Sequence, residues 1–361
     1  MEFALSEDQR LLQDSMRGVL ATASSLDEVR KVAAGEAGVA LAISGALSEM
    51  GAAQLLVPEA HGGLGLGALE AALVQETLGA HICPAHFMAG SILAVEAIKL
   101  AGSETQQTDW LGQIAGGDMH VCVALTERVS KREGAGLIWN NGKLSGKAIF
   151  ALETDGASHI LTCDEQGALY MVASDAVGLS QRTLRTIDRT RGFNELVFEK
   201  VEADALEGGR DGAATDRVIA LGRILLAADT LGAAGVMLEQ AIAYAGERKQ
   251  FGRVIGSFQA VKHMCAEMAA KLEPARALVW HGAYLFNTEP EKAALMACLA
   301  KSHISEIGTF IARTSTEVHG GMGFTDLVGL HYWFKRIGVN RQLLGSPEQL
   351  REEAARLQGW T

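Results

Sequence analysis

Residues suited to binding an anionic ligand that carries a flat ring gather in one stretch, GERKQFGRVIGSFQA. Arg248 supplies a guanidinium for charge-assisted hydrogen bonds to phosphate or carboxylate oxygens. Phe251 offers an aromatic surface, and the amides of Gln250 and Gln259 both donate and accept hydrogen bonds. This combination of residue types predicts a ligand-binding loop between two helices.

A simpler interpretation of the same stretch is the end of a helix. A cation near a helix C-terminus interacts favourably with the helix dipole, and Gly252 can adopt the left-handed conformation that closes many helices. Either way, Gln259 lies in the first turn of a new helix, for which Ser257 is the expected N-cap. The stretch by itself is compatible with both interpretations.

Composition limits the classes of function. The chain has 361 residues, enough for two or three domains, and 48% of them are hydrophobic, as in soluble globular proteins. A net charge of −11 argues against nucleic acid as a partner, because phosphate contacts need a basic surface. The five cysteines are scattered and form no Cys-x-x-Cys pair. We therefore expect reduced thiols, no metal site and a cytoplasmic protein.

Two segments were candidates for targeting or membrane insertion. The N-terminal stretch MEFALSEDQRLLQD is acidic and has no apolar core, so we do not expect a signal peptide. Ser6 and Gln9 instead predict a capping box at the start of a helix. The most apolar window, Val218–Leu238, is interrupted by Arg223 and Asp229. It predicts a buried helix and no membrane span.

The sequence pattern changes twice along the chain. Residues 1–118 show helical periodicity, and 119–207 contain short apolar runs with turn signals such as Asn-Asn-Gly. After a Gly-rich linker, 213–361 return to helical periodicity. Runs of one element type followed by another predict an α+β multidomain protein. We expect an N-terminal helical domain, a central β-barrel or sandwich domain and a C-terminal four-helix-bundle domain.

Three motifs in order resemble the acyl-CoA dehydrogenase family, and the likeness covers nearly the whole chain. LLVPEAHGGLGLG resembles the family's loop between early helices, and ERKQFGRVIGSFQA resembles its Arg-x-x-Phe-Gly segment with a glutamine eight residues after the phenylalanine. EVHGGMGF resembles the family's Gln-x-x-Gly-Gly-x-Gly-Phe segment. The resemblance implies the acyl-CoA dehydrogenase fold, the cofactor FAD and α,β-dehydrogenation of an acyl-CoA thioester.

The resemblance also implies an FAD that lies across a subunit boundary, with its pyrophosphate and adenosine end on the last two motifs. The residues to which it assigns cofactor contacts are Arg248, Gln250, Phe251, Gln259, Glu317, Gly320, Gly321 and Gly323. Glycines let backbone N–H groups approach a phosphate closely, although they also end helices. Glu317 departs from the family's glutamine and brings a carboxylate near the phosphates.

The segments that would hold the chain's own flavin ring are replaced. Where the family has Thr-Glu-Pro-Gly-Ala-Gly-Ser-Asp, this chain reads TERVSKREGAG, with bulky charged residues in place of glycines and small hydroxyls. Where the family has Trp-Ile-Thr, this chain has Ile149, Phe150 and Ala151. We therefore expect the chain to lack a flavin platform of its own.

The catalytic base is also missing. The family's reaction needs a carboxylate that accepts the α-proton of the substrate. The two positions that carry it in the family correspond here to Leu344 and Gly222, so no catalytic residue is assigned. Glu348 is an alternative base four residues beyond Leu344. A shift of one helical turn, about 6 Å, counts against it.

The two motifs to which the resemblance assigns contacts with a neighbouring subunit's FAD are not affected by these replacements. The pattern predicts the non-catalytic chain of a heterotetramer, resembling heteromeric bacterial acyl-CoA dehydrogenases of steroid degradation and lipid metabolism. Its expected partners are a catalytic acyl-CoA dehydrogenase subunit, an acyl-CoA substrate and an electron-transferring flavoprotein. Two alternatives stay open: an active homotetramer with Glu348 as a displaced base, and a non-enzymatic CoA-ester-binding scaffold.

Overall fold

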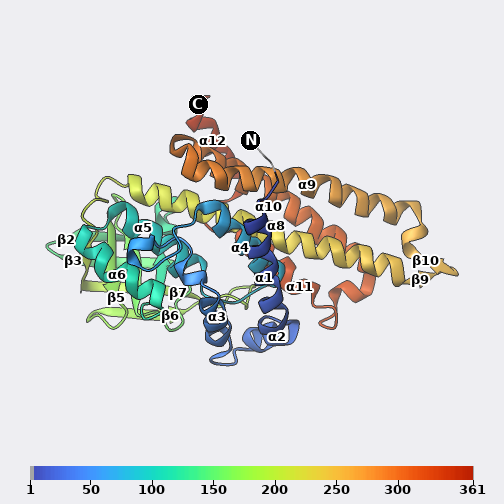
Figure 1. Ribbon diagram of the computed structural model, residues 1–361, viewed down its shortest axis with the longest axis horizontal. Helices are drawn as coiled ribbons and strands as arrows, with labels where there is room; N and C mark the ends of the chain where they lie inside the picture. The colour runs from blue at the N-terminus through green and yellow to red at the C-terminus, as the bar shows by residue number, and fades with distance from the viewer. Residues whose placement is uncertain (1–3, 361) are drawn as a thin grey trace. The chain divides into compact units, whose positions relative to one another are not determined.

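The computed structural model describes residues 4–360, which form two compact units (Figure 1). Unit 1 comprises the described parts of 1–30, 72–83 and 223–361, and unit 2 comprises 31–71 and 84–222. Residues 1–3 and 361, at the outer limits of the first and last domains expected from the sequence, lie outside the described residues. The division into three domains at 1–118, 119–207 and 213–361 stays a prediction.

Unit 2 combines helices with a β-sheet. Its helical elements include α3 (Val39–Glu49), the π-helix η3 (Met88–Ala94), α5 (Val95–Ala101), α6 (Glu104–Gly116) and the short α7 (Thr126–Val129). The N-terminus of α6 carries a capping box, in which Ser103 and Gln106 each bond to the other's backbone N–H. The π-helix packs against strand β1 (Val121–Ala124), so helix and sheet share one apolar core.

Eight strands of unit 2 form one sheet in the order β6-β7-β3-β1-β4-β5-β8, and β2 pairs with β3. Besides β1, the strands are β2 (Gly136–Asn140), β3 (Lys143–Leu152), β4 (His159–Cys163), β5 (Leu169–Ala173), β6 (Leu179–Thr183), β7 (Phe193–Glu202) and β8 (Asp204–Ala205). The β1–β4 pair is parallel and the other pairs are antiparallel. Inward-facing residues such as Leu144, Tyr170 and Leu196 form the core of the sheet.

The turns of this sheet follow the local sequence. Asn141 and Gly142 join β2 to β3 with φ of 49° and 80°, and this pair of positive φ values is what a two-residue hairpin turn requires. Residues 164–167 join β4 to β5. The hairpin predicted from the Asn-Asn-Gly turn signal is therefore confirmed.

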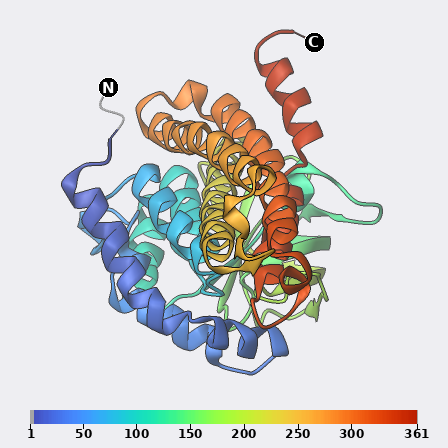
Figure 2. The same ribbon diagram turned by 90° about the vertical axis from the view of Figure 1, so that its right-hand side faces the viewer.

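Unit 1 is helical. Its main helices, some of which extend past its borders, are α1 (Glu7–Ala23), α4 (Ala68–Ala80), α8 (Ala213–Glu247), α9 (Gln259–Thr288), α10 (Ala293–His319), α11 (Leu330–Gln342) and α12 (Pro347–Leu357). Helix α10 packs against α9, α11 and α12, and Figure 2 shows α8 to α11 running side by side. Helices, then a sheet, then helices again confirm the α+β multidomain class that the sequence predicts.

A fully buried polar network fixes the register of three of these helices. Asp229 on α8 accepts hydrogen bonds from Asn340 at 2.6 Å and from Gln75 at 2.8 Å, and Arg336 lies 3.4 Å away. Asp229, Arg336 and Asn340 are 0% exposed. Because a buried charge is costly unless it is paired, this network requires α4, α8 and α11 to pack in one arrangement.

The ends and the burial of the helices test further sequence predictions. The capping box of Ser6 and Gln9 is confirmed at the start of α1. Ser257 as the N-cap of α9 is wrong: Phe258 holds that position, and the Ser257 hydroxyl donates to the Val254 carbonyl at 2.7 Å. Helix α8 is long and apolar enough to span a membrane, but 94% of its apolar window is buried inside the protein, as in a core helix.

Candidate functional site

The segment with Arg248 and Phe251 forms a small hairpin directly after α8. Strands β9 (Lys249–Gln250) and β10 (Arg253–Val254) pair antiparallel around a two-residue turn. In that turn Phe251 has φ of 52° and Gly252 has φ of 77°. Gly252 therefore belongs to a hairpin turn, and the interpretation of this residue as a helix cap is wrong. The turn leaves the Phe251 ring 93% exposed.

The polar side chains of the hairpin remain available to a ligand. Arg248 is exposed, and within residues 4–360 its guanidinium has no hydrogen-bond or ion-pair partner. Gln250 is exposed and donates only to the Lys249 carbonyl, at 2.8 Å. Gln259, the first residue of α9, lies 3.0 Å from the His263 ring and is also exposed. Three side chains that bind anions or hydroxyls thus face solvent.

Two residues that sequence reasoning missed give the hairpin its shape. The Arg253 guanidinium lies 4.0 Å from the centre of the Phe258 ring, and the Phe251 ring meets Phe258 edge-on at 6.2 Å. The only signal in the sequence is the spacing of a cation and an aromatic residue around Gly256. This stack holds the base of the hairpin while its tip stays exposed.

The second motif forms the turn that follows α10. Gly320 ends the helix with φ of 58° and ψ of −137°, and Gly320–Phe324 form a 3₁₀ turn. A Cβ on Gly321 would meet nothing within 4 Å, whereas a Cβ on Gly323 would lie 2.7 Å from the Thr316 carbonyl. Gly323 is therefore needed for packing, and Gly320 and Gly321 leave exposed backbone with room for a ligand.

A ring stack brings the two motifs together at one end of unit 1. Tyr244, in the last turns of α8, stacks on His319, the last residue of α10, with ring centres 4.6 Å apart. The hairpin lies at the far end of α8 and α9 in Figure 1, and Figure 2 looks onto this end. Glu317 is exposed on the last turn of α10. The structure thus places the eight sequence-predicted residues at one end of unit 1.

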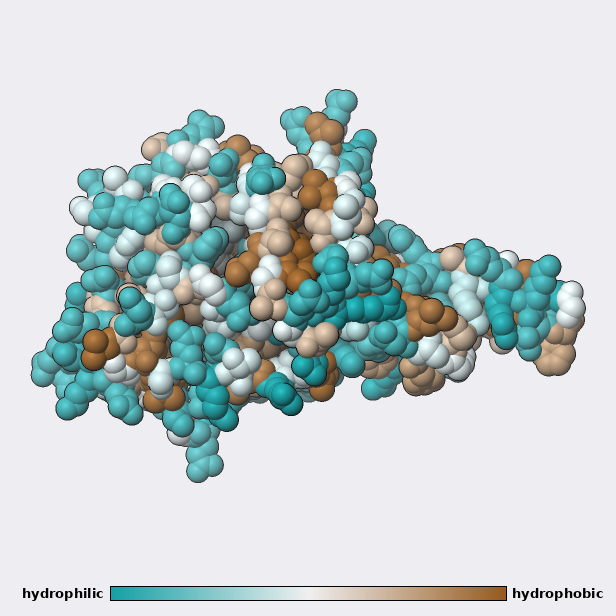
Figure 3. Space-filling view, turned by 90° about the horizontal axis from the view of Figure 1, so that it is seen from below, coloured by the Kyte–Doolittle hydropathy of each residue, from teal (hydrophilic) through white to brown (hydrophobic). Residues whose placement is uncertain are grey.

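This end of unit 1 also exposes large apolar side chains. Besides Phe251, Phe324 in the turn after α10 is 81% exposed. In Figure 3 this end lies on the right, where apolar residues interrupt a hydrophilic surface. An anion-binding set of side chains next to exposed aromatic groups is the surface that a ligand with phosphates and a ring would contact.

In unit 2, the chain's own side chains occupy the positions that correspond to a flavin platform. The Arg132 guanidinium lies 4.7 Å from the centre of the Phe150 ring and pairs with Glu127 at 3.1 Å. Phe150 also meets Phe193 edge-on at 6.0 Å. Glu127 accepts a second hydrogen bond from the Arg132 backbone N–H at 3.0 Å. These contacts do not fit a group that needs small residues and an open face.

Leu344, which corresponds to one of the family's two catalytic-base positions, lies in a buried loop that two basic side chains contact. Leu344 is 5% exposed and has φ of 53°, and its carbonyl accepts from Arg223 Nε at 3.0 Å. Arg223 also forms a bidentate pair with Glu353 at 2.7 and 2.9 Å. Lys301 Nζ donates to the Gly345 carbonyl at 2.6 Å. The loop therefore presents an apolar side chain and no carboxylate.

The other two base candidates also lack what proton abstraction needs. Gly222 is a buried residue of α8 and has no side chain. The Glu348 side chain is 62% exposed and pairs with Arg341 at 3.1 Å. Hydrogen bonds from its own backbone N–H and from Ser346 lower the pKa of Glu348. An exposed, ion-paired carboxylate with a lowered pKa is a weak base, which counts against a displaced catalytic Glu348.

Comparisons with known proteins agree with the fold and the motifs. The N-terminal domain of acyl-CoA dehydrogenases matches residues 6–118, and the C-terminal domain matches 211–358. Acyl-CoA dehydrogenase IpdE2 of Mycolicibacterium smegmatis is 29% identical over 356 residues, covering 96% of this chain and 98% of that protein. The chain belongs to the acyl-CoA dehydrogenase family, whose members are FAD flavoproteins.

Two solved structures of complexes or variants also share the fold. A variant of the Tcur3481-Tcur3483 steroid ACAD has a TM-score of 0.89 and 27% identity, covering 98% of each chain. The ChsE4-ChsE5 complex from Mycobacterium tuberculosis has a TM-score of 0.91 and 23% identity, covering 100% of each chain. The family relationship extends over nearly the whole length of this chain.

Proposed function

We propose that this chain is the non-catalytic subunit of a heteromeric acyl-CoA dehydrogenase and completes the FAD site of a catalytic partner. The observation that carries the proposal is the contrast between two regions of the chain. The hairpin end keeps Arg248, which has no partner among residues 4–360, and open glycine backbone, whereas the flavin-platform positions are filled by Arg132 and Phe150.

The residues of the hairpin end fit the diphosphate and adenosine part of FAD. Arg248 would hold pyrophosphate oxygens, and the N–H groups near Gly321 would approach them closely because nothing fills the space beside that residue. Gln259 would bond hydroxyl groups, and Phe251 would offer a face to a ring. Glu317, exposed at the same end, favours contacts with hydroxyls over phosphates.

In this assembly the partner supplies the chemistry. When bound, FAD would supply the hydride acceptor for α,β-dehydrogenation of an acyl-CoA thioester, and a carboxylate of the partner would take the α-proton. This chain would orient the cofactor and exclude water from its adenosine end. Likeness to the Tcur3481-Tcur3483 steroid ACAD supports a steroid-derived acyl-CoA as the substrate class. A cytoplasmic heterotetramer and transfer of electrons to an electron-transferring flavoprotein complete the proposal.

The test is the FAD content of the chain alone and of the chain co-expressed with its partner. Flavin absorbance and chain mass should give a colourless protein alone and two FAD per four chains in the complex. A yellow, active protein from this chain alone would refute the proposal and favour a homotetramer with its own base. A complex that forms without FAD would favour a CoA-ester-binding scaffold instead.

A further inference from the structure

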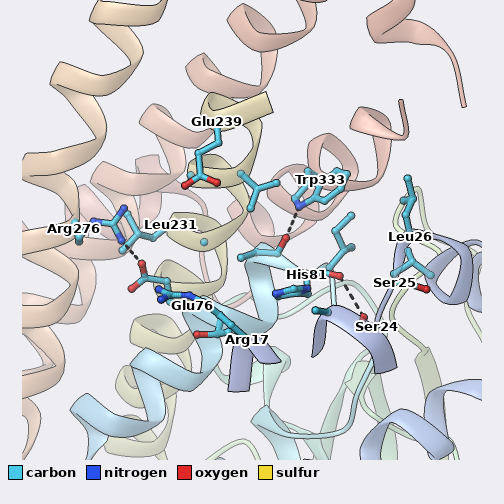
Figure 4. A pocket seen from close by; sticks show the side chains of 18 residues that line it. Arg17, Ser24, Ser25, Leu26, Glu76, His81, Leu231, Glu239, Arg276 and Trp333 are labelled. Atoms are coloured by element: carbon cyan, nitrogen blue, oxygen red, sulfur yellow. Dashed lines mark hydrogen bonds and ion pairs between the residues drawn. The ribbon is translucent and has the colours of Figure 1, made fainter. Parts of the chain in front are cut away.

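A cavity lies wholly within unit 1, lined by none of the residues of the hairpin end or of the base positions. Its volume is about 620 Å³, and residues of α1, α4, α8, α9 and α11 line it (Figure 4). Cavities of about 300–1,000 Å³ that combine apolar walls with a few polar groups are typical of small-molecule sites. Neither the family motifs nor the base positions account for this space.

One polar group of the cavity wall is already neutralised. Glu76 is 6% exposed, forms an ion pair with Arg276 and accepts a hydrogen bond from Trp280 Nε1 at 2.8 Å. Burial raises the pKa of Glu76, and Arg276, Trp280 and the nearby Arg17 charge lower it. The carboxylate therefore has its partners within the protein and leaves no net charge on this wall.

Arg17 is the cation of the wall that remains available. Within the described residues its guanidinium bonds only to Asp14, at 2.9 Å, in an exposed pair one helical turn away. Pairs of this kind contribute little to stability, so Arg17 can turn to a ligand at small cost. His81 lies beside it in Figure 4. Burial and then the Arg17 charge lower the pKa of His81, which places the two groups close together.

Apolar side chains share the rest of the cavity lining with Ser24, Ser25 and Thr77, and one acidic group lies on the far side. Leu26 and Leu231 line it, and Trp333 adds its ring while its indole N–H donates to the Ala80 carbonyl at 2.9 Å. A Cβ on Gly235 would meet nothing within 4 Å, so α8 presents bare backbone to the open space. In Figure 4, Glu239 lies across the cavity from Arg17 and disfavours a second negative charge there.

We propose that this cavity binds an amphipathic monocarboxylate, such as a free medium-chain acid. The carboxylate group would lie at Arg17 and His81, and the apolar body would pack against Leu26, Leu231 and Trp333. Arg17 offers bidentate hydrogen bonds to a carboxylate, and Glu239 excludes a dicarboxylate. The inference rests on unit 1 alone and does not depend on the proposed function.

Calorimetric titration of the full chain with octanoate tests the site, with octanol as the neutral probe of equal length. We expect one octanoate per chain and weaker binding of octanol. Arg17→Gln should weaken octanoate binding about tenfold, the loss expected for one exposed charge-assisted contact. Gly235→Leu should abolish binding because the side chain fills the cavity. Arg10→Gln, an exposed arginine of α1 outside the cavity lining, is the matched control and should change nothing.

Three results would overturn the proposal. Equal affinity for octanol and octanoate would show an apolar cavity without carboxylate recognition. Octanoate binding that survives both Arg17→Gln and Gly235→Leu would place the ligand elsewhere. No binding of octanoate to the unaltered chain would remove the site altogether. Arg17→Gln changes an exposed position, and circular dichroism of each variant confirms that the fold is kept.

Discussion

Replacing Arg248 by alanine tests the cofactor contact of the hairpin end. The Arg248 guanidinium is exposed and has no partner within residues 4–360, so its loss leaves no group of this chain unsatisfied. We expect an unchanged melting temperature of the chain. In the complex, Arg248→Ala removes charge-assisted hydrogen bonds of about 1.5–3 kcal/mol. Because Arg248 is exposed to solvent, we expect a loss near the lower end of this energy range, which corresponds to about tenfold weaker FAD binding.

The assay is FAD retention after dialysis of the co-purified complex, followed by titration of FAD back into the apo-complex. Lys249→Ala is the matched control, because Lys249 is the next exposed cation of the same hairpin and strand residues alternate between faces. The difference between the two variants should shrink at high ionic strength, since salt screens exposed charges. Equal FAD retention by both variants and the unaltered complex would refute the role of Arg248.

The remaining predictions concern the base positions and the cations around them. Leu344→Glu should give the isolated chain no dehydrogenase activity with any acyl-CoA and should lower its free energy of unfolding by about 1–3 kcal/mol, measured by urea unfolding, because a carboxylate enters a site that is 5% exposed. Activity after this change would contradict the absence of a flavin platform. Glu348→Gln should leave turnover of the complex within about twofold, as for an exposed surface pair; a hundredfold loss with FAD bound would identify Glu348 as the base. Burial and then the Arg223 charge lower the pKa of Lys301 from 10.5 to about 7, so between pH 7 and 10.5 the unfolded chain binds the extra proton and stability rises with pH. The unfolding free energy of the unaltered chain minus that of Lys301→Met should therefore rise by up to about 1.4 kcal/mol per pH unit above pH 7. A difference that does not change with pH would contradict this prediction.

The sequence predicted those elements whose signals are local. The capping box of Ser6 and the turn at Asn141 depend on residues within four positions of each other, and both were confirmed. The start of α9 was off by one residue because Ser257 ends the 3₁₀ turn Ile255–Ser257 and its hydroxyl bonds back to the Val254 carbonyl. The hairpin at Gly252 was missed because strands of two residues are too short to show alternation.

The two motifs of the candidate site could be predicted from the sequence, but the contacts that bring them together could not. Residue types around Arg248 and Gly321 identified the segments, whereas the ring stack of Tyr244 on His319 joins residues 75 positions apart and needs the tertiary structure. The sequence likewise predicted that the flavin-platform residues are replaced. It did not show that Arg132 lies over Phe150 and fills their place, because that contact depends on how β3 folds back beside α7.

The exposed hairpin has a consequence for how the chain is produced. Without the proposed partner, the chain presents Phe251 and Phe324 to water at 93% and 81% exposure. Clustered exposed apolar side chains favour self-association, and quality-control factors recognise them. A cell that makes this chain in excess over its partner would lose the excess to aggregation or proteolysis. In the proposed heteromeric assembly, balanced synthesis of the two chains would therefore be required by the tip of one hairpin and the turn beside it.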